Sequence, residues 1–131
     1  MKTIRRIVAI IAAALAAALL VTWAAEPPGY KVDEEVMVSG KVTSVSTVPD
    51  WMGKDGLNIA LLSAGIAVPH VDVATASFMR RFEFPIAVGD DLTMTGCWST
   101  ASDGQRVFLV HSLNKKQITL NVRDPMGAPL W

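Results

Sequence analysis

Alternating apolar and polar residues dominate the chain from residue 36 onward. In the run VMVSGKVTSVSTV, residues 36–48, the apolar Val36, Val38 and Val42 fall on even positions, and the polar residues at 39, 41 and 43 face the other way. A period of two predicts a half-buried β-strand. Gly40 lies inside this run, and a glycine within a strand suggests a bulge or a sharp coil.

Further strand-like runs follow, and turn residues separate them. The predicted strands after the first are residues 57–62, 66–71, 92–99, 107–113 and 117–122. Residues 73–82 instead carry apolar side chains near helical spacing, which predicts one short helix. Arg80 and Arg81 fall in its last turn, where basic residues complement the helix dipole, and Pro85 stops any continuation.

This order of elements predicts an all-β domain with one short helix. Five curved antiparallel strands with a helix between the third and the fourth is the plan of the OB-fold, a small and partly open barrel. We therefore expect an OB-fold-like barrel of five or six strands over residues 35–131. A two-sheet sandwich of similar size is the alternative.

The first 24 residues have the layout of a secretory signal peptide. Lys2, Arg5 and Arg6 precede a long uncharged apolar run, and cleavage after Ala24 leaves small residues around the cut. The alternative is an uncleaved anchor helix over residues 7–25, because 19 uncharged residues are just long enough to span a membrane core of about 30 Å.

Both alternatives place the body of the chain outside the cytoplasm, in the periplasm. Positive charge on the short N-terminal flank holds that end inside. Residues 25–34, with two prolines and a glycine, are expected to link the membrane region to the barrel. A membrane contact is expected only through the N-terminal segment, if it stays uncleaved.

Without the leader, the body has nine basic and twelve acidic residues, a net charge of −3. This balance argues against nonspecific nucleic-acid binding, which depends on neutralising many phosphates. Cys97 is the chain's single cysteine, so no internal disulfide and no zinc or haem cysteine motif can form. Its place in a predicted strand favours a buried, inert thiol over a reactive one.

Six residues are candidates for binding. Trp51, in the loop between the first two strands, could stack on a ligand or cover the open barrel end. Arg80 and Arg81 could bind an anionic partner or cap the helix, and Asp103 lies in an Asp-Gly turn of a second exposed loop. His70 and His111 could form a copper or iron site, or be structural histidines on separate strands.

The body resembles a family of small exported OB-like domains that includes the magnetosome-associated MamS and MamX domains. The resemblance rests on V-S-G-K-V at residues 38–42, G-L-N-I at 56–59, a Gly-Asp turn at 89–90 into a strand ending Thr-Gly at 95–96, and V-R-D-P-M-G-A-P-L-W at 122–131. It covers residues 36–131, and the last segment is its most specific part. Asp72-Val73 stand where the family often has Gly-Pro, and the haem-attachment CxxCH of MamX-type proteins is absent, so the resemblance supports the fold more than electron transfer.

No hydrolase motif is present: the chain has no G-x-S-x-G, no H-E-x-x-H and no P-loop. We therefore expect a non-enzymatic, exported binding or assembly module for an envelope protein or complex, with no cofactor. The alternative is a metal-handling accessory protein that uses His70 and His111. An enzyme would require a buried and convergent cluster of polar groups.

Overall fold

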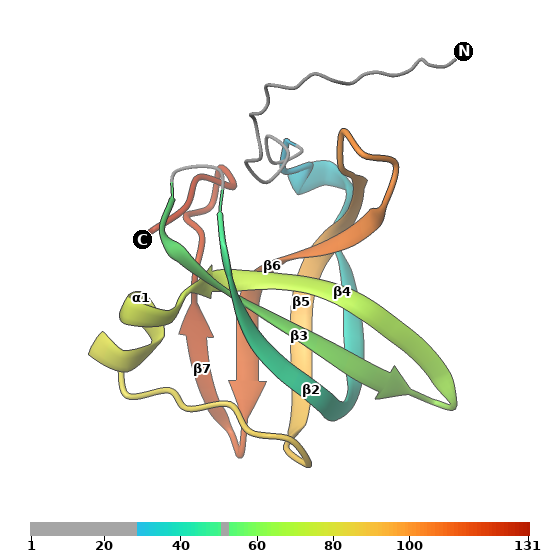
Figure 1. Ribbon diagram of the computed structural model, residues 1–131, viewed down its shortest axis with the longest axis vertical. Coiled ribbons are helices and arrows are strands. Elements are labelled where there is room, and N and C mark those ends of the chain that lie inside the picture. The colour runs from blue at the N-terminus through green and yellow to red at the C-terminus, as the bar shows by residue number, and fades with distance from the viewer. Residues whose placement is uncertain (1–28, 51–52) are drawn as a thin grey trace.

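The computed structural model describes residues 29–50 and 53–131, and one continuous sheet contains every strand in them (Figure 1). The elements are η1 (Val32–Glu34), β2 (Val36–Pro49), β3 (Asp55–Ser63), β4 (Ile66–Thr75), α1 (Ala76–Arg81), β5 (Asp91–Thr100), β6 (Arg106–Lys115) and β7 (Ile118–Asn121). The leader, its cleavage point and Trp51 lie outside the described residues. Within the described part, no helix is long and apolar enough to cross a membrane.

The sheet closes into a barrel. Its strand order is β4-β3-β2-β5-β6-β7, and all neighbouring strands in this order are antiparallel. A short parallel ladder, in which Val71 pairs with Phe108 and Asp72 with Leu109, joins β4 to β6 and completes the closure. The predicted all-β barrel with one short helix is confirmed, and its strand order and helix position agree with the OB-like plan.

β2 changes partners half-way along its length. Its residues 36–41 pair with β5, and its residues 41–49 pair with β3. A Cβ atom on Gly40, at this crossing, would lie 2.8 Å from the carbonyl oxygen of Leu62. The glycine therefore allows two backbones to approach closely, and the register shift that we expected at Gly40 lies further on, between Val42 and Ser44.

The inner face of β2 is only partly covered. Val42 is fully buried and Val38 is half-buried, as their alternation predicts. Val36, predicted to face inward with them, is 45% exposed. Its partner in β5 is Gly96, which offers no side chain to pack against it.

The predicted helix begins three residues too early. Val73 lies in β4 and is fully buried, because the ladder between β3 and β4 continues as far as Thr75, which pairs with Gly56. The side-chain oxygen of Thr75 then accepts a hydrogen bond from Phe78 N at 3.2 Å and caps α1. Val73 therefore follows the strand period of two from Val71 rather than the helical period.

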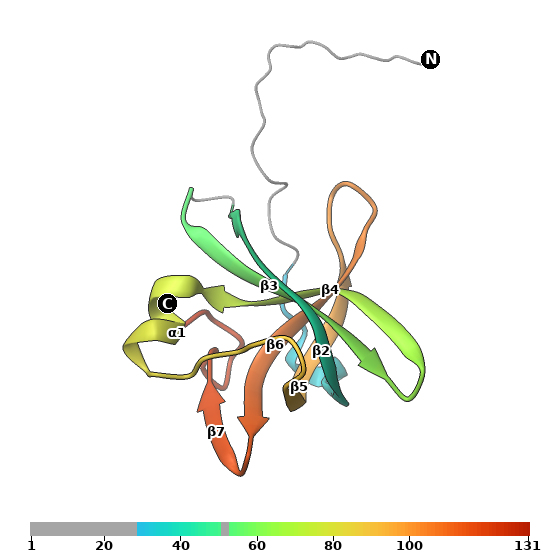
Figure 2. The same ribbon diagram turned by 60° about the horizontal axis from the view of Figure 1, so that its bottom comes forward.

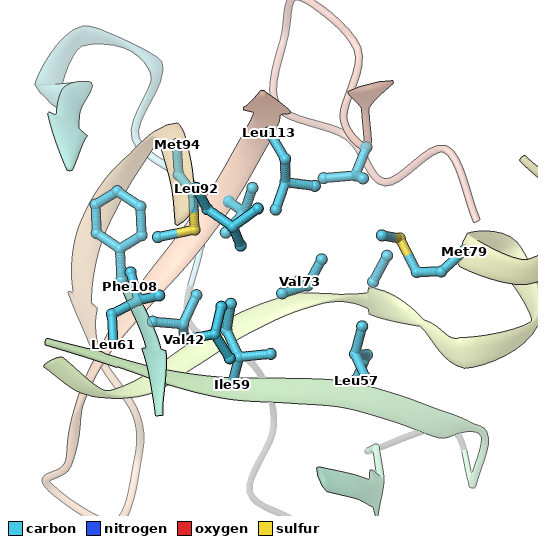
Figure 3. Close-up of a cluster of buried hydrophobic side chains, with 14 of the residues drawn as sticks. Val42, Leu57, Ile59, Leu61, Val73, Met79, Leu92, Met94, Phe108 and Leu113 are labelled. Carbon is cyan, nitrogen blue, oxygen red and sulfur yellow. The ribbon is translucent and has the colours of Figure 1, made fainter. Parts of the chain in front are cut away.

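The core fills the barrel and extends under α1 (Figure 3). Strands β2 to β6 each contribute buried apolar side chains, among which Leu61, Leu92, Met94, Phe108 and Leu113 are almost completely inaccessible. Met79 reaches the core from α1, on the side where Leu57 lies (Figure 3). Cys97 is fully buried, as predicted.

Gly96 is the tightest point of the barrel. A Cβ atom there would lie 2.1 Å from the carbonyl oxygen of Leu109 and 2.8 Å from the ring of Phe108. We expect Gly96→Ala to lower the free energy of unfolding by about 3 kcal/mol or more, because backbone must move to relieve the clash. Urea denaturation would measure the loss. Gly29→Ala, which meets no atom within 4 Å, is the control, and equal stability of the two variants would contradict this account.

Candidate functional site

A groove beside α1 is an apolar hollow on the barrel. Its volume is about 600 Å³. Apolar side chains form most of its wall and two charged residues complete it; the lining residues are Leu57, Ala76, Met79, Arg80, Glu83, Phe84, Pro85 and Ile86. We call it the α1 groove.

The groove exists because the chain reverses at the end of α1. Phe84 N donates to Met79 O at 3.1 Å, and Glu83 between them adopts the left-handed conformation with φ of 53°. The reversal lays Phe84 and the residues after it beside the helix. Lys115 holds this segment in place, because its ammonium donates to Pro85 O and lies 5.7 Å from the ring centroid of Phe84.

The two adjacent arginines of α1 have different surroundings. Arg80 is exposed at the groove, and its guanidinium has no hydrogen-bond or ion-pair partner among the described residues. The guanidinium carbon of Arg81 instead lies 5.7 Å from the ring centroid of Phe78 and 5.6 Å from that of Phe82. From the sequence, Arg80 and Arg81 have the same possible roles, but of the two only Arg80 lines the groove.

The other predicted binding residues lie away from the α1 groove. The Asp103 carboxylate accepts a hydrogen bond from Gln105 N at 3.0 Å, which stabilises the turn between β5 and β6. Figures 1 and 2 both show this turn on the opposite side of the molecule from α1. Trp51 lies outside the described residues.

The two histidines are not brought together. Because Asp72 pairs with Leu109 in the parallel ladder, His111 stands level with Ala74. His70 is four residues from Ala74, which is about 13 Å along a strand. In the described part of the chain, no group of three or more histidine, cysteine or acidic side chains could hold a metal ion.

A polar cluster that the sequence did not predict joins the N-terminal segment to the barrel. One carboxylate oxygen of Glu35 accepts hydrogen bonds from the Tyr30 hydroxyl and from His111 Nδ1, both at 2.5 Å. The bond from Tyr30, and then that from His111, lowers the pKa of Glu35. Burial raises the pKa of Tyr30, and the bond to Glu35 acts in the same direction. Part of the predicted linker, at Tyr30, thus packs on the barrel.

Arg123 lies next to this cluster and is only 8% exposed. Its guanidinium group donates to Val110 O at 3.2 Å and to Gly127 O at 2.9 Å. The rings of Tyr30 and Trp131 contact it, with centroids 5.0 and 5.2 Å from the guanidinium carbon. Burial lowers the pKa of Arg123, and the negative charge of Asp72 partly offsets this. Arg123 therefore connects the N-terminal segment to the C-terminal segment.

The C-terminal segment folds into a tight turn that supports Arg123. The Asp124 carboxylate accepts hydrogen bonds from Met126 N and Ala128 N, each at 2.9 Å. Gly127 has φ of 91°, and a Cβ atom there would lie 2.6 Å from the Tyr30 ring. Trp131 is partly buried and packs against the core. These contacts explain why Arg, Asp, Gly and Trp occur at these positions.

The polar cluster is convergent, but its groups bind one another. Glu35 accepts from two donors, and Arg123 donates to two backbone carbonyls. None of these side chains lines the α1 groove. The arrangement therefore accounts for the docking of two chain segments rather than for a substrate site.

The chain matches one known protein family. The family model of the MamS/MamX magnetosome protein family matches residues 34–120. The chain belongs to this family. The matched range begins at the end of η1 and reaches into β7, so it includes the whole closed barrel, α1 and the α1 groove.

Membership of the MamS/MamX family supports a magnetosome-associated domain, and this is not a known enzyme family. The resemblance noted in the sequence is thus confirmed. The segment 122–131, which looked most specific, lies beyond the matched range. A search of curated proteins finds no match.

Glu35→Gln tests the polar cluster through its pH dependence. Because the folded pKa of Glu35 is lowered, its charged form contributes stability above the ordinary glutamate pKa, and this stability is lost as the pH falls through the lowered value. Between about pH 6 and about pH 3, we expect a smaller loss of stability in Glu35→Gln than in the natural chain. Urea denaturation across this range would measure it. A flat difference between Glu35→Gln and the natural chain across this range would exclude the linkage.

Arg123→Lys tests the buried guanidinium. Lysine keeps the charge but lacks the planar fork that serves two carbonyls and contacts two rings. We expect a loss of about 2–3 kcal/mol in unfolding free energy, measured by urea denaturation. Arg80→Lys, at an exposed and unpartnered guanidinium, should change stability by less than about 0.5 kcal/mol. Similar values for the two variants would rule out a structural role for Arg123.

Proposed function

We propose that this MamS/MamX domain is an exported, non-enzymatic binding or assembly module of the bacterial envelope, and that it binds a protein partner at the α1 groove. The leader supports export to the periplasm, either as a cleaved signal peptide or as an anchor over residues 7–25. The α1 groove supports the binding role, because it combines an apolar hollow with Arg80, whose guanidinium has no partner among the described residues.

The chemistry of the groove fits a protein segment. Its volume of about 600 Å³ lies in the range of ligand sites, and its walls are mostly apolar. Phe82, the residue before Glu83 of the lining, is 51% exposed. Arg80 offers a guanidinium group that can bind a carboxylate in a bidentate manner. We therefore expect the partner to present apolar side chains with an acidic residue beside them.

The absence of an enzymatic role is part of the proposal. The described residues that converge, Tyr30, Glu35, His111 and Arg123, bind one another and lie outside the groove. The groove itself has one acid, Glu83, and one base, Arg80, and neither a histidine nor a cysteine lines it. These residues can bind and orient a partner through charge and apolar contacts, but they do not include a group suited to nucleophilic or acid–base catalysis.

Site-specific photo-crosslinking in the native envelope tests the proposal. A photoreactive residue at Ile86, inside the groove, should capture a discrete partner, whereas one at Asp103 should not. Arg80→Glu should reduce capture at Ile86 about tenfold, because charge reversal opposes the partner's acidic residue. Arg81→Glu is the matched control, since Arg81 lies on the rings of α1.

Two outcomes would refute this assignment. Capture from Asp103 but not from Ile86 would move the binding surface to the loop between β5 and β6. Capture at Ile86 that Arg80→Glu and Arg81→Glu reduce equally would show that the charge at the groove rim has no role in recognition.

A further inference from the structure

The second half of β2 has an open edge. Up to Lys41 this edge pairs with β5, and at Val42 it bonds to the loop before β5, through Val42 N to Asp90 O and Gly89 N to Val42 O, both at 2.8 Å. From Ser44 to Val48 the strand pairs with β3 on its other side, and no described strand pairs with the open edge. Figures 1 and 2 show β2 and β3 extending beyond the barrel together as a two-stranded ribbon.

The middle of this edge carries neither charge nor proline; a bulge between Val42 and Ser44 precedes it, and Pro49 ends the strand. Residues 43–48 are all exposed, contain no charge and no proline, and include the β-branched Val45 and Val48. Edge strands are normally protected by charges, by proline or by being short. Two other edge strands have such protection: β4 contains Pro69, and β7 has four residues next to Lys115 and Lys116.

The second half of β2 lies beside Leu57, the β3 residue that lines the α1 groove. Thr47 pairs with Leu57, a groove residue, and Val45 pairs with Ile59. Directly paired residues of an antiparallel ladder point to the same face. Ile59 is 2% exposed, yet Val45 beside it is 36% exposed. The side chains that bury this face of β3 therefore do not extend over β2. A strand added to β2 would lie where that cover is missing.

We propose that the partner supplies an extended strand that pairs with Ser44–Val48 of β2 and directs alternate apolar side chains toward the α1 groove. This inference rests on the proposed function and names the binding mode. Main-chain hydrogen bonds would supply affinity, and the groove would select the alternate side chains. Residues 43–48 carry no charge, so the part of the partner that pairs with them is expected to be uncharged and β-branched or aromatic. Arg80 is charged, so an acidic residue is expected at the end of the segment that reaches the groove.

A synthetic peptide provides the probe. It is an acetylated eight-residue peptide of alternating valine and threonine that ends in glutamate, and a version with proline at every second position is the peptide control. In the full chain, we expect the first peptide to slow hydrogen exchange at alternate amides of Ser44–Val48 at least tenfold, measured by NMR. The proline version should protect none of them, because it cannot form the ladder.

Two variants on neighbouring positions separate the faces of β2. Thr47→Arg places a charge on the face shared with Leu57 and should weaken peptide binding at least tenfold. Ser46→Arg, which pairs with Asn58 on the opposite face, should weaken it less than twofold. Both positions are exposed, so both variants should fold, and urea denaturation checks this.

Failure of this inference is distinguishable from failure of the proposed function. Capture at Ile86 that depends on Arg80 but is unchanged by Thr47→Arg would overturn strand addition and leave the groove as the binding site. Absence of amide protection in Ser44–Val48, or equal effects of Thr47→Arg and Ser46→Arg, would also overturn it. Self-association of the chain through β2, seen by sedimentation and abolished by Thr47→Arg, would assign the edge to a second copy instead.

Discussion

Closure of the barrel depends on two places where backbone approaches backbone with no side chain between them. At Gly96, β5 comes so close to Leu109 of β6 that a single methyl group would collide with the carbonyl. At Gly40, β2 passes close to Leu62 of β3, where a Cβ atom would lie 2.8 Å from the carbonyl oxygen, while it exchanges one partner strand for another. These contacts set the curvature that brings β4 against β6, and the buried core depends on that closure.

The two ends of the described chain are joined by one buried cation. Removing a guanidinium group from water is costly, so a buried arginine needs hydrogen bonds and favourable charge around it. Arg123 obtains them from two carbonyls, from the rings of Tyr30 and Trp131, and from the charge of Asp72. Neither Tyr30 nor the C-terminal turn is among the residues that line the α1 groove.

Local patterns predicted the strands well, because the period of two is a property of neighbouring residues. They failed at Val73, whose apolar spacing fits both a helix and a strand, and only pairing with β3 decides between them. The α1 groove could not be predicted, because it depends on the reversal at Glu83 and on Leu57 from another strand. The polar cluster could not be predicted from local pattern either, because Glu35 and His111 are 76 residues apart in the chain.

Val42 divides β2 into two parts with different physical roles. Before it, the strand pairs with β5, and Gly40 permits the close crossing at which β3 becomes its partner. After it comes the bulge between Val42 and Ser44, and no described strand pairs with the edge away from β3, so the N–H and C=O groups of that edge are available to water or to another chain. The second half of β2 thus keeps an open edge beside Leu57 of the barrel's own apolar groove. The edge and the groove both favour the same kind of partner, an extended apolar strand.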